Sequence, residues 1–232
     1  MKRATFLAWC VHFYTATGLI IAALMAVLIV RGGDEAFRTA FLLMLVATFI
    51  DSTDGWLARR ARVKQVVPSF DGSTLDNLID FQTYTSLPLL LVWRAGLLPG
   101  AYAWWLLLPL LASGYGFSQT KAKTDDGFFL GFPSYWNVVA FYLYYLQPPV
   151  PVSLALIISL SVLTFIPARY LYPSQRAPFN RLTIVLASLW GVLVLLLILR
   201  RNENERLLTL VSLVFPIYYL LMSWALTIRR RG

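Results

Sequence analysis

Long runs of apolar residues, separated by short polar segments, dominate the chain. Most runs approach or exceed the roughly 20 residues that a helix needs to cross a bilayer. Pro133 interrupts the fifth run, so a shorter helix that begins near Ser134 is the alternative there. The expected fold is all-α, a polytopic transmembrane bundle of about eight spans, with residues 1–232 in one domain. The predicted helices cover residues 4–30, 36–60, 72–93, 99–120, 128–147, 151–172, 181–200 and 206–228.

The composition agrees with a membrane protein, because 59% of the 232 residues are hydrophobic and only 13% are charged. The net charge is +9, but the basic residues lie in short segments between apolar runs. Anionic lipid headgroups are therefore the expected partners, and nucleic acid is not. The single cysteine excludes an internal disulfide. Arg59, Arg60, Arg62 and Lys64 form one of the basic segments, which places that end of the spans in the cytoplasm.

Four aspartates interrupt this apolar pattern. Asp51 and Asp54 are three residues apart, and Asp76 and Asp80 are four apart, so each pair shares one face of a helix. Two neighbouring helices would point all four carboxylates at a common volume, where their repulsion favours a bound cation. Carboxylate oxygens are the hard ligands that Mg²⁺ and Mn²⁺ prefer. The alternative, a role in capping helices, fits Asp71 but not acids that lie within apolar helices.

The same stretch contains a spaced motif of acids and small residues. It reads Asp51, Asp54-Gly55, Ala58-Arg59, Gly72, Asp76 and Asp80. This spacing resembles that of the CDP-alcohol phosphotransferase family at every fixed position. The spacer between its two halves, residues 60–71, is longer than is usual in the family. A spacer of this length is similar to that of the bacterial branch that makes phosphatidylcholine.

The resemblance implies an enzyme of the inner (plasma) membrane, with its active site facing the cytoplasm. An alcohol would attack CDP-diacylglycerol at the phosphorus nearer the lipid, and CMP would leave. Two ions of Mn²⁺ or Mg²⁺ are expected, with Asp80 as general base. The implied metal ligands are Asp51, Asp54, Asp76 and Asp80. The residues implied to bind CDP-diacylglycerol are Thr15, Asp54, Gly55, Ala58, Arg59 and Gly72.

Thr15 has an alternative, a hydroxyl that bonds back to its own helix. His12, the one histidine of the chain, is predicted to be structural. Aromatic residues near the motif suit choline, because quaternary ammonium groups bind aromatic faces. The alternative for these rings is an interfacial aromatic belt. The expected choline-binding residues are Tyr84, Tyr115, Tyr135, Trp136 and Asn137.

Two other functions fit the same sequence pattern. The same chemistry with serine or another alcohol as acceptor is one alternative. A cation-coupled membrane transporter is another, because buried acids bind ions in transit in such proteins. The last two predicted spans contain no polar cluster of their own, and we expect them to act as scaffold or as contacts of a homodimer.

Overall fold

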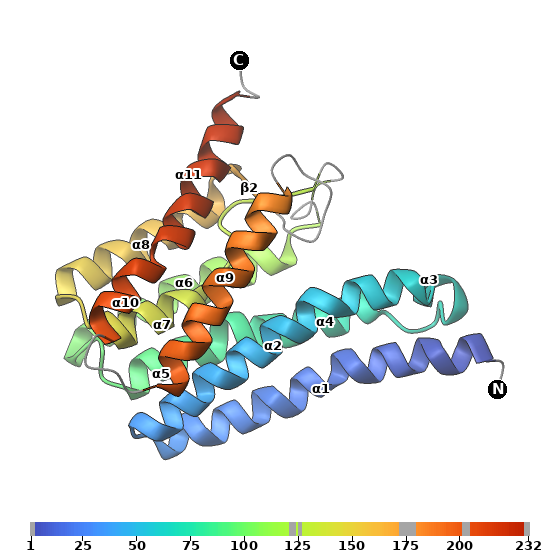
Figure 1. Ribbon diagram of the computed structural model, residues 1–232, viewed down its shortest axis with the longest axis horizontal. Coiled ribbons are helices and arrows are strands. Elements are labelled where there is room, and N and C mark those ends of the chain that lie inside the picture. The colour runs from blue at the N-terminus through green and yellow to red at the C-terminus, as the bar shows by residue number, and fades with distance from the viewer. Residues whose placement is uncertain (1–2, 121–123, 125–126, 172–179, 201–204, 230–232) are drawn as a thin grey trace.

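In the computed structural model, residues 3–120, 124, 127–171, 180–200 and 205–229 are described. The chain opens with two long helices, α1 (Arg3–Arg31) and α2 (Asp34–Arg60), which run side by side (Figure 1). Gly32 and Gly33 form the turn between them with φ of 72° and 91°. Only glycine adopts such angles at little cost, so these two residues allow α2 to fold back along α1.

A short helix, α3 (Val63–Val66), leads to a composite span made of α4 (Gly72–Asp80), η1 (Phe81–Ser86) and α5 (Leu87–Arg94). This span confirms the helix predicted over residues 72–93. The Asp71 carboxylate caps α4 by accepting hydrogen bonds from the backbone N–H groups of Ser73 and Thr74. These bonds and one from the Thr74 hydroxyl hold the pKa of Asp71 below its ordinary value. The capping role predicted for Asp71 is confirmed.

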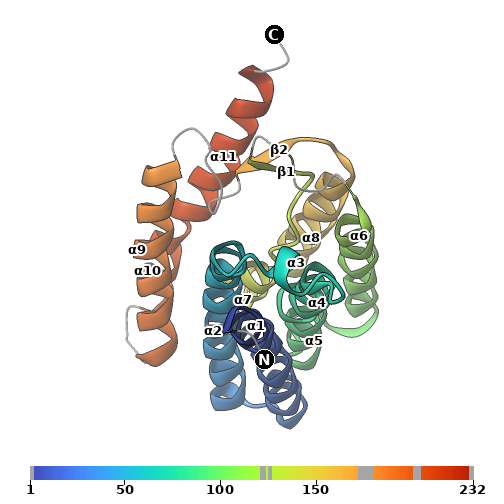
Figure 2. The same cartoon turned by 90° about the vertical axis from the view of Figure 1, so that its right-hand side faces the viewer.

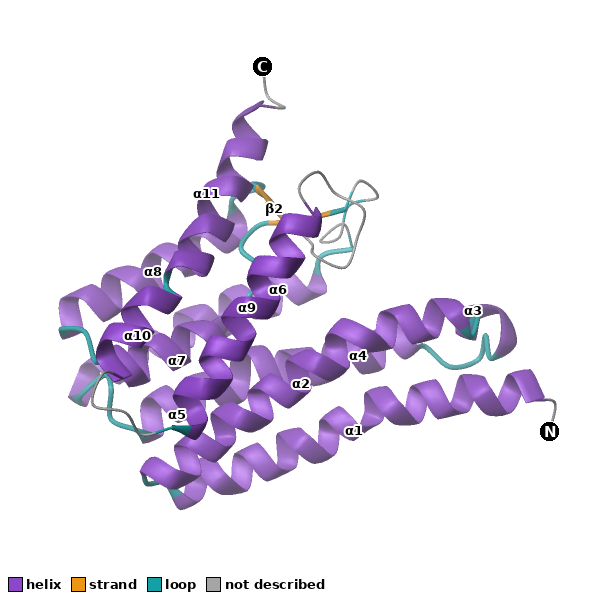
Figure 3. Cartoon of the chain, viewed as in Figure 1, coloured by secondary structure: helices purple, strands orange, loops and turns teal. Residues whose placement is uncertain are grey.

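The middle of the chain contains η2 (Gly100–Leu106), α6 (Leu107–Ser118), β1 (Phe128–Leu130), α7 (Trp136–Leu146), α8 (Val150–Phe165) and β2 (Arg169–Leu171). Two of the helices predicted in this part of the chain are longer than those in the structure. The one over 128–147 begins only at Trp136, because Pro133 lacks an N–H group and Ser134 has a φ of 57°. The one over 151–172 ends at Phe165, close to Pro167. Residues on either side of these helices form an antiparallel β1–β2 pair instead, the only strands in the described part (Figure 3).

The chain ends with α9 (Asn180–Leu199), α10 (Glu205–Ser212) and α11 (Val214–Arg229). Four helical segments of the described chain are long and apolar enough to cross a membrane: Arg3–Arg31, Asp34–Arg60, Arg181–Leu199 and Glu205–Arg229. A shorter apolar helix covers Val150–Phe165. These segments support a multi-pass membrane protein, while the number of eight spans stays a prediction.

Seen end on, α1, α2, α4 and α5 form one side of a bundle that α6, α7 and α8 complete (Figure 2). α9 lies against α2, and α11 lies against β2. Near the start of α2, Arg38 forms an ion pair with Asp34 of the same helix and a second one with Glu205, which begins α10. Tyr144 of α7 donates a further hydrogen bond to Asp34 at 2.6 Å. The helices after residue 180 are therefore tied to the first half of the chain.

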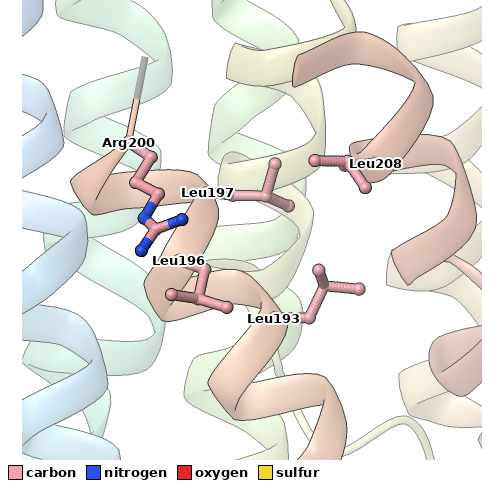
Figure 4. A pocket seen from close by; sticks show the side chains of 5 residues that line it. All are labelled: Leu193, Leu196, Leu197, Arg200 and Leu208. Atoms are coloured by element: carbon pink, nitrogen blue, oxygen red, sulfur yellow. The ribbon is translucent and has the colours of Figure 1, made fainter. Parts of the chain in front are cut away.

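A crevice of about 200 Å³ lies between α9 and α10, lined by leucines with Arg200 at its edge (Figure 4). The backbone of Leu197 in this crevice accepts a hydrogen bond from Arg38. Asp51 lies 13 residues farther along α2 than Arg38, roughly 20 Å away at the rise of an α-helix. The crevice is therefore separate from the acidic motif.

Candidate functional site

The acidic motif lies where α2 passes α4. Asp51 of α2 and Asp76 and Asp80 of α4 each offer a carboxylate oxygen, and these atoms lie within 4.8 Å of one another. Asp76 and Asp80 are one helical turn apart, which lets both face Asp51. The structure therefore brings together three acids that are up to 29 positions apart in sequence. Three oxygen donors at this separation fit one or more hard divalent cations.

Asp54, the fourth predicted metal ligand, lies one turn beyond Asp51 on α2 and is not part of this group of three. Its side chain is 6% exposed and accepts a hydrogen bond from the Thr15 hydroxyl at 2.8 Å. The bond of the Thr15 hydroxyl thus goes to the motif on α2 and not to its own helix, while binding of CDP-diacylglycerol by Thr15 stays a prediction. This bond aligns α1 with the acidic segment of α2.

Tyr84 connects the acids to the segment that follows them. Its hydroxyl donates a hydrogen bond of 2.7 Å to Asp51, and its side chain is buried. Tyr84 lies in η1, a π-helical segment that starts directly after Asp80. π-helical turns are uncommon and occur frequently at functional sites, because the wider turn changes the direction of the side chains. Here Tyr84 of this segment lies over the acid of the neighbouring helix.

Small residues of the motif lie where other groups come close. A Cβ atom added to Gly72 would be 2.8 Å from His12 Cε1, so glycine is needed for α4 to start beside α1. His12 itself is buried, and its ring lies 4.4 Å from that of Phe70. A Cβ added to Gly55 would lie 3.4 Å from a guanidinium nitrogen of Arg59. The exposed Arg59 side chain therefore lies back over Gly55, one turn beyond the acids.

The other motif residue, Ala58, is half-buried and packs against the small apolar cluster of Ala8, Val63 and Val67. It lies on the same turn of α2 as Arg59, between the acids and α3. Its small side chain lets the segment after α2 approach α1, which contacts α3 directly. Ala58 thus has a packing role in addition to its place in the motif.

The aromatic residues expected at the acceptor site fall into two groups. The Tyr135 ring lies 6.1 Å from that of Tyr84. Trp136 is fully buried, and its indole N–H donates to the Ser113 hydroxyl at 2.9 Å. Tyr115 is largely exposed, and its ring packs on Phe165 of α8. Of these rings, the structure places Tyr84 beside a carboxylate, that of Asp51, and Tyr135 next to Tyr84.

Asn137, the last of the expected residues, lies in the first turn of α7 and is half-buried. Its side-chain amide nitrogen approaches the Thr48 hydroxyl of α2 at 3.5 Å. Thr48 is three residues before Asp51, so this contact brings the start of α7 to the acidic half of α2.

One aromatic residue near this group was missed by the sequence reasoning. The Tyr219 ring lies 5.9 Å from that of Tyr135 and is buried. It comes from α11, in a span expected to be scaffold. Its apolar neighbours in sequence give no signal of a site, and only the packing of α11 across β2 brings it here.

The site was compared with known proteins by sequence. The family model described as CDP-alcohol phosphatidyltransferase matches residues 12–167, which include every acid of the motif. A phosphatidylcholine synthase of Legionella pneumophila is 35% identical over 231 residues, covering 94% of this chain and 88% of that protein. The phosphatidylcholine synthase of Pseudomonas aeruginosa is 35% identical and covers 85% of this chain and 82% of its own length.

A third relative, the phosphatidylcholine synthase of Bradyrhizobium diazoefficiens, is 39% identical over 189 residues, which is 81% of this chain and 70% of that protein. The matches cover the acids, the glycines and most of the helices described above. Together with the grouped carboxylates of α2 and α4, they confirm the resemblance seen in the spaced motif. The chain belongs to the CDP-alcohol phosphatidyltransferase family.

Proposed function

We propose that this protein transfers the phosphatidyl group of CDP-diacylglycerol to choline, which yields phosphatidylcholine and CMP. The observation that carries the proposal is the group formed by Asp51, Asp76 and Asp80 within the matched family region. The relatives named phosphatidylcholine synthase favour choline over serine or another alcohol as the acceptor. The family match also favours a transferase over a cation-coupled transporter.

The reaction exchanges one oxygen for another at phosphorus. The choline oxygen forms a bond to the phosphorus nearer the diacylglycerol, the bond to the bridging oxygen breaks, and CMP leaves with that oxygen. The protein's task is to position the two substrates and to balance charge, since no covalent intermediate is needed. Two divalent ions, Mn²⁺ or Mg²⁺, would neutralise the diphosphate when bound.

We assign the four motif acids to the metal site, with Asp54 beside the group of three. The oxygen-only donor set fits Mn²⁺ or Mg²⁺ rather than a softer metal. Asp80 is our candidate for the base that accepts the proton of the choline hydroxyl, because it is buried and lies next to Asp51. Asp76, one turn earlier, would hold the metal on the same face of α4.

For the donor substrate, we assign Arg59 to the diphosphate, which its guanidinium can meet with two parallel hydrogen bonds. We assign Gly55 to the same site because an added Cβ there would lie 3.4 Å from the Arg59 guanidinium, and Gly72 because it starts the helix that carries Asp76 and Asp80. Thr15 and Ala58 complete the set, Thr15 through its bond to Asp54. We propose that this end of the bundle, and with it the active site, faces the cytoplasm from the inner membrane, which the basic residues after α2 support.

For the acceptor, the supporting observation is that Tyr84 bonds to Asp51 and that the Tyr135 ring lies next to the Tyr84 ring. Tyr115, Trp136 and Asn137 stay in the proposal as outer residues of this site. We also propose that the chain forms one domain, which the contacts of α9 with α2 and of α10 with α7 support. A homodimer stays a prediction.

The test is a transfer assay with purified protein and CDP-diacylglycerol in detergent micelles. Radiolabelled choline, serine, inositol and glycerol phosphate are supplied one at a time, with Mn²⁺ or Mg²⁺. We expect labelled lipid with choline, in a one-to-one ratio with released CMP, and loss of both products with a chelator. Labelled lipid from serine alone would overturn the choice of acceptor. Ion transport without any CMP release would overturn the transferase itself.

A further inference from the structure

We propose that α11 completes the choline site, and that Tyr219 is a specificity-determining residue whose ring contacts the trimethylammonium group. This inference rests on the proposed function and goes beyond it. It assigns part of acceptor recognition to a helix outside residues 12–167, the region that the family model matches. The observation is a row of three tyrosine rings that starts at the acids and ends on α11.

The row is built from three separate elements. Tyr84 of η1 donates to Asp51, and its ring lies 6.1 Å from that of Tyr135, which immediately precedes α7. The Tyr135 ring in turn lies 5.9 Å from that of Tyr219. Successive rings are inclined by 47° and 61° rather than stacked flat. Inclined rings can present more than one aromatic face to a rounded cation.

The position of Tyr219 is fixed from the side of β2. Its hydroxyl donates to the Leu171 carbonyl at 2.9 Å, and its ring packs against those of Tyr170 and Phe215. Ser223, one turn later on α11, accepts from the Leu171 N–H at 3.2 Å. Two bonds to the same residue of β2 hold α11 at this point. The ring thus occupies a set position next to Tyr135.

The chemistry of the row matches choline. Its hydroxyl must lie near the carboxylates to react, and its ammonium group is only two carbons away. That length places the charge over rings beside the acids rather than in water. Tyr84 and Tyr219 are buried, and a cation over an aromatic face is held more strongly where water is excluded. The bond from Tyr84 to the Asp51 carboxylate also adds electron density to the first ring.

A set of single substitutions tests the role of Tyr219, with steady-state transfer measured against choline and against CDP-diacylglycerol. Tyr219→Leu removes the ring, and we expect the choline KM to rise about tenfold while the KM for CDP-diacylglycerol stays within twofold. Tyr219→Phe keeps the ring and removes the hydroxyl with its bond to Leu171, so its choline KM should stay within threefold. The matched control is Tyr218→Leu, which changes the adjacent α11 residue, whose hydroxyl lies by Thr183.

A second readout uses the neutral carbon isostere of choline, in which a carbon atom replaces the ammonium nitrogen. Wild-type protein should prefer choline to this isostere as acceptor, and Tyr219→Leu should reduce that preference about tenfold. A merely structural role for Tyr219 predicts equal losses with both acceptors. It also predicts that the Phe variant fails as badly as the Leu variant, because both lose the hydroxyl.

The outcomes separate this inference from the proposed function. If the wild-type protein transfers phosphatidyl groups to choline but Tyr219→Leu leaves the choline KM unchanged, α11 has no part in the site. Equal losses for choline and its isostere would overturn the inference as well. If the wild-type protein forms no phosphatidylcholine, the proposed function itself fails, and the row of tyrosines then has no choline to bind.

Discussion

The hydrogen bond from Tyr84 to Asp51 allows the metal site to be tested separately from the acceptor site. The substitution Tyr84→Phe removes one oxygen atom and leaves the aromatic ring in place. The lost bond is short, at 2.7 Å, and its acceptor is a carboxylate in the group of three acids. Asp51 then keeps its charge but loses a donor that fixes the direction of its oxygens.

The size of the effect follows from the type of bond. A hydrogen bond to a charged group contributes about 1.5–3 kcal/mol. Tyr84 is 7% exposed, so solvent does not screen this bond. At 1.4 kcal/mol for each factor of ten, the loss of this bond corresponds to about 10–150-fold in the affinity for the metal ion. Loss of an outer partner of a metal ligand typically costs 10–100-fold. We therefore expect the half-saturating Mn²⁺ concentration to rise by about 10–100-fold.

The assay is the release of CMP from CDP-diacylglycerol and choline, measured over a series of Mn²⁺ concentrations. The matched control is Tyr14→Phe, because Tyr14 shares a hydrogen bond of the same 2.7 Å length with Thr53, which is not an acid. The control should leave the half-saturating concentration within about threefold. At saturating Mn²⁺, the choline KM of Tyr84→Phe should stay near the wild-type value, because the ring remains.

Two results would refute this reasoning. If Tyr84→Phe needs no more Mn²⁺ than the wild-type protein, Asp51 does not depend on Tyr84 for its orientation. If the variant needs less Mn²⁺, the tyrosine competes with the metal for the carboxylate instead of positioning it. An equal rise for Tyr14→Phe would show a general loosening of α1 and α2.

Three further predictions concern the acids and the backbone. Asp76→Ala and Asp80→Ala should each reduce CMP release by about 10²–10⁴-fold with normal membrane insertion, and near-normal turnover in either would remove that acid from the site. Gly131→Ala should lower the free energy of unfolding by about 2–4 kcal/mol in thermal unfolding, because φ there is +83° and the added Cβ meets the backbone of Thr164. The control Gly114→Ala, which has open space around the added Cβ, should change that free energy little. The folded-state pKa of Asp71 lies below its ordinary value of 3.8, so its stabilisation is present above pH 3.8 and is lost as the pH falls through the lowered pKa. The melting temperature of Asp71→Ala should therefore be lower than that of the wild-type protein at pH 7, and the two should converge in acid. A difference that does not change with pH would contradict a capping role for the ionised Asp71 carboxylate.

Much of the fold could be predicted from the sequence, because a bilayer strongly constrains which residues a spanning helix contains. Long apolar runs predicted α1, α2 and the composite span of residues 72–94 with small errors at their ends. The errors elsewhere have local causes. Pro133 delayed the start of α7, and β1 and β2 formed from residues that hydropathy alone assigns to helices. The paired residues of β1 and β2 are 39 to 43 positions apart, so their pairing depends on the tertiary fold and leaves no local pattern in the sequence.

In the candidate site, too, local features could be predicted from the sequence and long-range contacts could not. The spacing of Asp51 and Asp54, and of Asp76 and Asp80, determined which acids share a helix face, because helical periodicity is a local property. The sequence could not decide that Asp54 bonds to Thr15 while the other three acids gather, or that η1 brings Tyr84 to Asp51.

The sequence by itself therefore determined the class of protein, the family and the acidic motif, because each depends only on composition or on the fixed spacing of nearby residues. Tertiary structure alone decided which aromatic residues follow Tyr84 in the row that starts at Asp51. Tyr135 and Tyr219 are 84 positions apart, in stretches that look alike in hydropathy. They meet because β2 anchors α11 across the bundle, and such long-range packing depends on the whole chain at once.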